Sequence, residues 1–221
     1  MSNTCIIPVR KGSERLPKKN YKILEGKSIL EIAILKAIES KVFDEIYINT
    51  DDELLEKVSE EYGIKFHHRD VNLANSDATS DQVVFDFFNT FNCSNLFWLN
   101  TVSPLQTIED IQNFVRTSKK QGWKSGVSYS PSYVHSFHEN TPINFEWSGG
   151  FAKTQDLKPI DCLNYAMMGW SSSMIPKLKD GQLFDENTTL VESSRWSNYL
   201  LKTQEDFEII KLLYKNLYKE K

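Results

Sequence analysis

Cysteine is scarce in this sequence, and its spacing excludes two common roles. The 221 residues contain three cysteines, Cys5, Cys93 and Cys162, which are far apart in the chain. Because no Cys-x-x-Cys pair occurs, the sequence indicates neither a zinc site nor a disulfide framework. Cys5 and Cys93 lie in or beside apolar segments, which favours buried thiols over nucleophiles.

Long apolar runs and an excess of positive charge are also missing. No apolar run approaches the roughly 18 residues that a membrane span needs. The sequence starts with a strand rather than a signal peptide, so we expect a cytoplasmic protein. The net charge of -4 argues against nucleic acid as a partner, since general nucleic-acid binders are basic overall. A chain of 221 residues with 40% apolar and 25% charged residues favours one globular domain, 1–221.

Three familiar site motifs are absent. The sequence has neither the Gly-x-x-x-x-Gly-Lys-Ser/Thr pattern of a P-loop nor the Gly-x-Gly-x-x-Gly pattern of a dinucleotide-binding turn. It also lacks the His-Glu-x-x-His pattern of a zinc protease. Any nucleotide or metal site must therefore be built differently.

The sequence has instead a cationic loop directly after its first apolar strand. The residues of this loop that can contact a ligand, together with the proline before them, are Pro8, Arg10, Lys11, Gly12, Ser13, Arg15, Lys18, Lys19 and Asn20. Arginine and lysine neutralise phosphate charge, and glycine lets the backbone approach a ligand closely. We therefore predict a phosphate-binding loop, with a solvated basic turn as the alternative.

Strand and helix patterns alternate along the chain. We expect strands at 4–8, 45–49, 65–68, 95–99 and 125–129, and helices at 29–39, 50–62, 80–91, 107–121 and 203–218. This βαβαβ order predicts an α/β fold with three layers, in which a mostly parallel sheet is flanked by helices. Ser28 is expected to cap the first helix.

The segment from about 130 to 166 departs from this alternation, because prolines, glycines and aromatic residues gather in it. We expect a small insertion that projects from the sheet, with a hairpin at 144–151 around a Ser-Gly-Gly turn. Residues 165–175 then return to the core. The aromatic residues that favour a homodimer interface here are Tyr133, Phe137, Phe145, Trp147 and Phe151. The alternative is a satellite core under the hairpin.

Three polar segments follow predicted strands. They are the cationic loop, the acidic run 50–53 and the segment 100–105. Because the carboxyl ends of parallel strands meet at one edge of a sheet, we expect these segments to converge there.

Motifs spread over almost the whole chain resemble those of one family. The segments that carry the resemblance are 7–13 with Lys19-Asn20, Gly26-Lys27, 43–53, Arg69 with 73–77, 103–105, 155–157 and 203–207. The first is similar to the pattern Ile-Pro-Ala-Arg-x-Gly-Ser-Lys-x-x-x-x-Lys-Asn of the acylneuraminate cytidylyltransferases. That family includes the CMP-sialic acid synthetases and the related CMP-Kdo and CMP-pseudaminic acid enzymes.

The resemblance implies a nucleotide-diphospho-sugar transferase-like fold, a homodimer, and CMP transfer from CTP to a small acid sugar with release of pyrophosphate. The residues that it favours for catalysis are Arg10 and Lys19. Those expected at the nucleotide are Pro8, Arg10, Gly12, Ser13, Arg15, Lys19, Asn20, Asp77 and Ser103. Those expected at the acid sugar are Asn100, Gln106, Gln155 and Tyr165. Structural alternatives remain for some of them: Asp77 as a helix cap, Asn20 as a turn residue and Ser103 as the end of a strand.

The chain also departs from the family pattern. Glu14 stands where the family has lysine, Gln106 replaces an arginine, and Asn100-Thr101-Val102 replaces Gln-Pro-Thr. Leu200-Leu201-Lys202 occupies the place of an Asp-Ile-Asp segment whose aspartates look like Mg²⁺ ligands in the family. A leucine cannot bind a hard cation, and a lysine has the wrong charge.

Three interpretations of this replacement remain open. Phosphates and other carboxylates hold the Mg²⁺, or Lys202 supplies the positive charge in its place. The third is a non-catalytic homologue that binds a nucleotide or a protein partner. The altered segment 100–106 also favours, as a further alternative, a cytidylyltransferase for a different acidic acceptor.

Overall fold

One seven-stranded sheet forms the centre of the protein in the computed structural model, which describes residues 2–12, 16–148 and 151–218. The order of the strands is β11-β7-β10-β6-β1-β4-β5. Their bounds are β1 (Asn3–Pro8), β4 (Glu45–Thr50), β5 (Lys65–His68), β6 (Asn95–Leu99), β7 (Ser125–Ser132), β10 (Ile160–Ser171) and β11 (Thr189–Glu192). β10 runs antiparallel to both of its neighbours, and the other pairs are parallel. The predicted mostly parallel sheet is confirmed.

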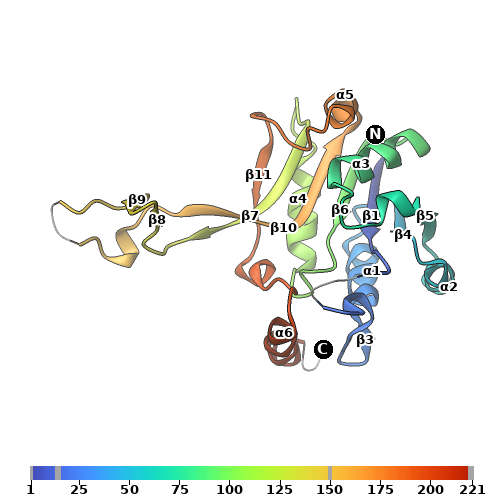
Figure 1. The fold of residues 1–221 in the computed structure, drawn as a ribbon, viewed down its shortest axis with the longest axis horizontal. Coiled ribbons are helices and arrows are strands. Elements are labelled where there is room, and N and C mark those ends of the chain that lie inside the picture. Colours follow the sequence, from blue (N-terminus) through green and yellow to red (C-terminus); the bar gives the residue numbers. More distant parts are fainter. Residues whose placement is uncertain (1, 13–15, 149–150, 219–221) are drawn as a thin grey trace.

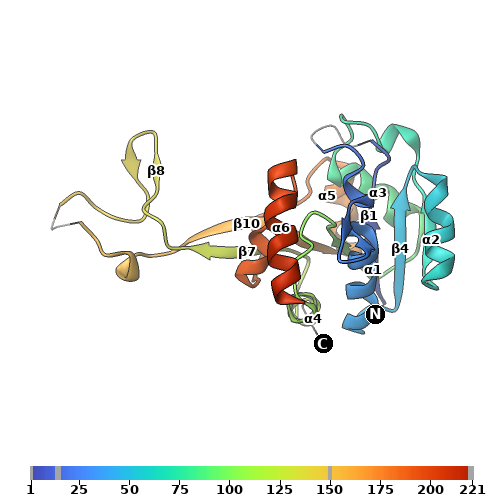
Figure 2. The same ribbon diagram turned by 90° about the horizontal axis from the view of Figure 1, so that it is seen from below.

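Helices cover both faces of this sheet (Figures 1 and 2). Their bounds are α1 (Ile29–Ser40), α2 (Glu56–Glu61), α3 (Ser80–Thr90), α4 (Ile108–Thr117), α5 (Ile175–Lys179) and α6 (Gln204–Leu217). Short 3₁₀ turns join them: η1 (Lys19–Tyr21), η2 (Glu53–Leu55), η3 (Val71–Leu73), η4 (Thr154–Asp156), η5 (Ser172–Met174) and η6 (Arg195–Asn198). No helix in the described ranges is long and apolar enough to cross a membrane.

Alternation along the central strand β1 builds two cores. Cys5 and Ile7 belong to a core that includes α1, α2 and α4, whereas Ile6 belongs to a second core with α3 and α5. Each of these three side chains is fully buried. Burying an isoleucine contributes about 1.5–3 kcal/mol relative to leaving it in water. The three-layer arrangement follows from this period-two pattern.

Hydroxyl caps fix where several helices begin. The Ser28 side chain accepts from the backbone N–H of Glu31, whose carboxylate in turn accepts from the Ser28 N–H. The predicted Ser28 cap is thus confirmed as a capping box. Thr107 and Thr203 cap α4 and α6 in the same way, each with an aspartate three residues later.

A third apolar cluster joins the end of the cationic loop to the end of the chain. Leu16 and Leu24 pack in it with Leu105, with Leu201 and with Phe207 of α6. Leu201 is fully buried, and its N–H donates to the carbonyl of Val102 at 2.7 Å. This packing holds three segments that are distant in sequence at the same edge of the sheet.

The chain between β7 and β10 forms an arm that projects from the sheet (Figure 1). Its hairpin consists of β8 (Phe137–His138) and β9 (Thr141–Pro142), joined by Glu139 and Asn140 at positive φ. Such a two-residue turn suits a tight hairpin.

The hairpin predicted at 144–151 is therefore wrong, because residues 144–148 and 151 include no strand. Gly149 and Gly150, its intended turn, lie outside the described residues. Phe145 instead packs against His135, Phe137 and Phe151, with ring centroids 4.9, 5.1 and 5.7 Å away. These aromatic contacts compete with the extended alternation that a hairpin needs.

Other elements also differ from the sequence prediction, and the helix predicted at 107–121 ends at Thr117. Strand β11 pairs with β7 outside the predicted set, because a four-residue segment carries little periodic signal. The helix predicted at 50–62 starts later, since Thr50 completes β4 and Asp52 caps η2 by accepting from the Leu54 N–H. Cys5 and Cys93 are buried thiols as predicted, and Cys162 is exposed.

Candidate functional site

The carboxyl ends of β1, β4 and β6 meet at one edge of the sheet, and the predicted polar segments gather there. Arg10 follows β1, and its Nη1 donates to the carbonyl of Asn75 at 3.3 Å. The backbone N–H of Lys11 donates to Asp51 Oδ1 after β4 at 2.9 Å. The expected convergence of these segments is confirmed. Ser13, Glu14 and Arg15 lie outside the described residues, whereas Gly12 is exposed.

A cavity of about 190 Å³ opens at this edge. Its walls come from the end of β1, the segment after β5, the start of α3 and β6. The lining residues are Pro8, Arg10, Arg69, Leu73, Asn75, Ala78, Thr79, Ser80, Val83 and Trp98. Two of them carry buried N–H donors, Arg69 Nε and Trp98 Nε1, that have no hydrogen-bond partner within the part of the chain that the structure describes.

Arg69 is the most buried cation of this cavity, with 5% of its surface exposed. Its Nη2 donates to the carbonyls of Val9 at 2.6 Å and Asn49 at 3.1 Å. Burial lowers the pKa of its guanidinium to about 10, and the nearby carboxylate of Asp51 opposes that shift. Arg69 therefore stays charged at neutral pH and places a positive charge in the wall of the cavity.

The 3₁₀ turn η1 brings the second half of the cationic loop against the segment after β6. Asn20 is buried, and its Oδ1 accepts from the hydroxyl of Thr101 at 2.8 Å. Lys19 precedes it in η1 and is half-buried. The hydroxyl of Tyr21 donates to Asp52 at 2.6 Å. Burial of the Tyr21 phenol raises its pKa, and the contact with Asp52 adds a second, smaller upward shift.

Not every residue expected at a ligand faces the open edge. Ser103 is buried, and its hydroxyl donates to the carbonyl of Ser197 at 2.9 Å. Gln106 is buried and lines an internal cavity beside Lys36 of α1. Asp77 is exposed, and its N–H donates to Asn75 Oδ1. Their binding roles remain predictions.

Besides the buried Gln106, the residues expected at the acid sugar lie in two places. Asn100, at the end of β6, donates from its N–H to the carbonyl of Ala166 at 3.0 Å, and Nδ2 donates to that of Tyr165 at 3.4 Å. The structure thus brings Asn100 and Tyr165 together. Gln155 is exposed on η4, in the arm that extends away from the sheet (Figure 2).

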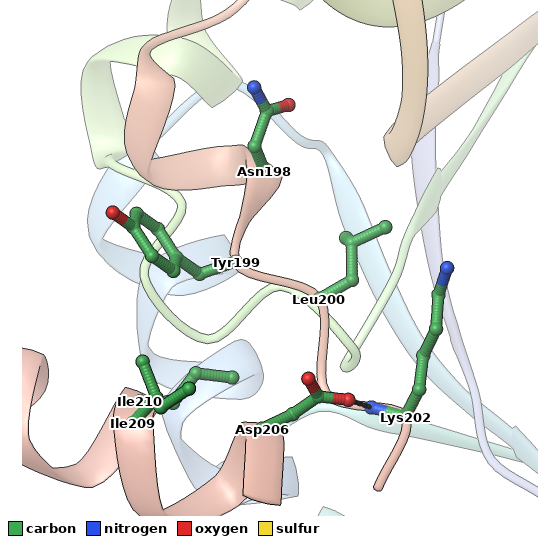
Figure 3. Close-up of a pocket in the computed structure, with 7 residues that line it drawn as sticks. All are labelled: Asn198, Tyr199, Leu200, Lys202, Asp206, Ile209 and Ile210. Atoms are coloured by element: carbon green, nitrogen blue, oxygen red, sulfur yellow. Dashed lines mark hydrogen bonds between the residues drawn. The ribbon is translucent and has the colours of Figure 1, made fainter.

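The segment before α6 forms one wall of another cavity, of about 270 Å³ (Figure 3). Leu200 and Lys202 point to the same side of this segment, and the ring of Tyr199 lies on the other side (Figure 3). The Oδ2 of Asp206 accepts from the backbone N–H groups of Lys202 and Thr203 at 2.9 and 2.8 Å. This carboxylate caps the helix.

These residues do not fit a divalent cation. Leu200 offers no donor atom, Lys202 is cationic, and Asp206 is used by two backbone N–H groups. No group of three or more His, Cys, Asp or Glu side chains that could hold a metal occurs in residues 2–12, 16–148 and 151–218.

Three residues that line the first cavity were not predicted as site residues: Arg69, which the sequence analysis named only for its resemblance to the family, Ser80 and Trp98. Arg69 directly follows β5, so its position after a strand was an available signal. Trp98 lies inside the buried strand β6, where periodicity indicates only core packing. Ser80 is the first residue of α3, where its pattern cannot be told from that of an ordinary helix start.

Lys36 of α1 anchors the segment 100–105, which follows β6. Its side chain is buried, and its ammonium donates to the carbonyl of Pro104. Burial lowers the pKa of Lys36 to about 7, while the carboxylates of Asp110 and Glu39 oppose the shift. The ring of Tyr218 lies 5.5 Å from its Nζ. A group that anchors this segment therefore titrates near neutral pH.

Comparison with known proteins comes from sequence and from structure. The profile of a family described as Cytidylyltransferase matches residues 4–145. N-acylneuraminate cytidylyltransferase of Streptococcus agalactiae serotype V is 29% identical over 216 residues, which are 94% of this chain and 52% of that protein. Pseudaminic acid cytidylyltransferase of Campylobacter jejuni serotype O:2 is 42% identical over 85 residues, 38% of this chain and 37% of that protein.

Among solved structures, CMP:2-keto-3-deoxy-manno-octonic acid synthetase complexed with CTP superposes with a TM-score of 0.72 at 14% identity. The match covers 98% of this chain and 100% of that one, so the two share the nucleotide-diphospho-sugar transferase fold. The chain spans about half the length of the curated streptococcal relatives it matches.

The titration of Lys36 gives a testable prediction for stability. The folded pKa lies below that of an unfolded lysine, so between about pH 7 and pH 10 the unfolded state binds more protons. The free energy of unfolding contributed by this group must then rise with pH, by up to about 1.4 kcal/mol per pH unit. We expect Lys36→Met to remove that rise in urea denaturation at pH 7 and pH 9.

Lys57→Met, on the exposed face of α2, is the matched control and should keep the wild-type pH dependence. Equal pH dependence in wild type and Lys36→Met would contradict the prediction.

Proposed function

The chain belongs to the cytidylyltransferase family, and on that basis we propose that it transfers CMP from CTP to an acid sugar of the nonulosonic type with release of pyrophosphate. The observation that carries this proposal is the cavity at the carboxyl end of β1, where Arg10 and the buried Arg69 supply positive charge. The Nε of Arg69 itself and the Nε1 of Trp98 are buried N–H donors that suit the oxygen acceptors of a nucleotide.

In the proposed reaction, a hydroxyl oxygen of the acid sugar attacks the α-phosphorus of CTP. A new P–O bond forms, the bond from that phosphorus to the bridging oxygen breaks, and pyrophosphate leaves with the electron pair. The proton of the hydroxyl passes to solvent. The role of the protein is to hold the triphosphate in line and to offset the charge that develops on pyrophosphate. Arg10 and Lys19 are the residues assigned to that task.

Lys202 stands where the family resemblance places an aspartate that looks like a metal ligand. We propose that the Lys202 ammonium contributes positive charge beside the phosphates and that Mg²⁺ enters bound to CTP. The support is positional. The N–H of Leu201 donates to the carbonyl of Val102, and Leu201 belongs to the same apolar cluster as Leu16, so Lys202 directly follows a residue that is held beside two loops of the site.

We also propose a homodimer built through the arm, located in the cytoplasm. Several aromatic side chains of the arm are exposed, with 53% for Tyr133, 48% for Phe137 and 67% for Trp147. Aromatic residues are enriched at protein interfaces. Gln155 lies on the same arm. In the proposed dimer, Gln155 would therefore contact the acceptor site of the partner subunit.

Loss of the loop cations should weaken CTP binding. We expect Arg10→Ala and Lys19→Ala each to raise the Kd for CTP about tenfold to a hundredfold, since a charge-assisted contact contributes about 1.5–3 kcal/mol. Isothermal titration measures this. Lys57→Ala should bind CTP as wild type does. Wild-type affinity in both loop variants would remove the loop from the site, and absence of CTP turnover with every acid sugar would indicate a non-catalytic homologue.

The role of Lys202 can be tested in the pyrophosphate-release assay. Lys202→Ala should lower kcat/KM at least tenfold, about 1.4 kcal/mol in the barrier. Leu200→Asp combined with Lys202→Asp should increase the dependence on Mg²⁺. Lys211→Ala, exposed on α6, is the control for removing a lysine charge nearby. A silent Lys202→Ala would contradict the assignment.

The homodimer makes a separate prediction. Wild type should sediment as a dimer at micromolar concentration, and Trp147→Ser combined with Phe137→Ser should shift it toward the monomer. The same variant should leave CTP affinity unchanged, because neither ring lines the cavity. A monomeric wild type at that concentration would contradict the proposal.

A further inference from the structure

Tyr165 has an unusual backbone for a bulky residue, with φ at +53°. Within the described ranges, the other non-glycine residues at positive φ lie at turns or helix ends: Lys18, Glu25, Lys41, Glu139 and Asn140. Tyr165 lies inside the strand β10. A left-handed conformation destabilises a residue with a side chain by about 1–2 kcal/mol, so something around Tyr165 must hold it.

A bulge in β10 sets this conformation. Leu163 pairs with Tyr129 of β7 and Met168 pairs with Val127, so the four residues 164–167 lie opposite Ser128 alone. On the other side of β10, Met167 pairs with Leu99, the last residue of β6. The bulge therefore sits where β6 delivers Asn100 to the site.

Buried hydrogen bonds fix both ends of the bulge. Asn164 is 3% exposed, and its Oδ1 accepts from the hydroxyl of Ser128 at 2.6 Å and from the N–H of Ala166 at 3.1 Å. The Nδ2 of Asn164 donates to the hydroxyls of Ser130 and Ser193 at 3.1 and 2.9 Å. At the other end, the N–H of Met167 donates to the hydroxyl of Ser128 at 3.0 Å.

These anchors leave one residue pointing outward. Asn164, Ala166 and Met167 are buried, whereas Tyr165 keeps 43% of its surface exposed. The carbonyls of Tyr165 and Ala166 accept from Asn100 and tie the bulge to the end of β6. The surrounding hydrogen bonds thus hold Tyr165 in a strained backbone conformation, which keeps its aromatic ring at the edge of the sheet where Asn100 follows β6.

We propose that Tyr165 is a specificity-determining residue whose ring forms a platform for the acceptor sugar. This inference rests on the proposed function. An aromatic face packs against the C–H groups on one side of a sugar ring, and the phenol adds a polar tip for its hydroxyls. The preorganised bulge means that little entropy is lost when the sugar binds.

The experiment distinguishes the role of the Tyr165 ring in binding the sugar from the role of residue 165 in the backbone of the bulge. Tyr165→Gly removes the ring and relieves the positive φ, so we expect the KM for the acid sugar to rise at least tenfold while the Kd for CTP stays within twofold. Its melting temperature should fall by no more than about 2 °C, because glycine adopts positive φ without strain. Tyr165→Phe keeps the ring and should retain most of the acceptor affinity.

Lys41→Gly is the matched control. Lys41 also has positive φ, at 54°, but caps α1 at a distance in the fold from Asn100, so its glycine variant should leave the KM unchanged. The acceptors to compare are N-acetylneuraminic, pseudaminic and N,N'-diacetyllegionaminic acids. Among the acids that the wild type uses, Tyr165→Gly should also reduce the differences in kcat/KM between one acceptor and another.

The outcomes distinguish this inference from the proposed function. An unchanged KM and unchanged discrimination in Tyr165→Gly, with normal wild-type turnover, overturn the role of Tyr165 alone. A KM that rises together with a large loss of melting temperature indicates a structural role and also overturns it. Wild type that binds CTP but neither turns over nor binds any of the three acids in titration overturns both.

Discussion

The hydrogen bonds of the buried Arg69 guanidinium are the interaction on which the site depends. One nitrogen of Arg69 donates to the carbonyls of Val9 and Asn49, which follow or end neighbouring parallel strands. A buried carbonyl without a donor is costly. The carbonyl of Asn49 also accepts from the backbone N–H of Val9 at 2.9 Å, so Arg69 adds a second donor there. Arg69 donates to both while its charge stays in the cavity wall, so the same group ties the ends of β1 and β4 together and makes this edge of the sheet cationic.

Polar side chains in the interior play a comparable part on the other side of the sheet. Asn164 connects β10 to β7 and to the segment around Ser193, and Asp110 accepts from Ser194 and Ser197 as well as capping α4. A buried polar network is stable only when its members are satisfied together, and such a network then fixes a single arrangement. The loops of the site are therefore held by a rigid framework and not by their own sequences.

The sequence predicts the framework better than the site. Period-two runs such as Cys5 to Ile7 and helix caps such as Ser28 are local signals, so the sheet, most helices and the convergence of loops could be predicted. The burial of Ser103 and Gln106 depends on contacts with Ser197 and α1, far away in the chain, which no local pattern encodes. Tyr165 was selected by resemblance, but its left-handed backbone arises from a register shift between two strands. The hairpin failed because aromatic packing in the arm overrides turn preference.

The strand order has a consequence for how this chain is made. β1 is an interior strand of the sheet, yet one of its partners is far along the chain: the side chain of Asn3 accepts a hydrogen bond from that of Asn95, 92 residues later. At about 5–20 residues per second, a ribosome needs several seconds to deliver β6 after β1 has emerged. During that interval the apolar residues Cys5, Ile6 and Ile7 have β4 as a neighbour on one side only. The nascent chain thus carries an unpaired apolar strand edge, the kind of surface that chaperones shield, until β6 is synthesised.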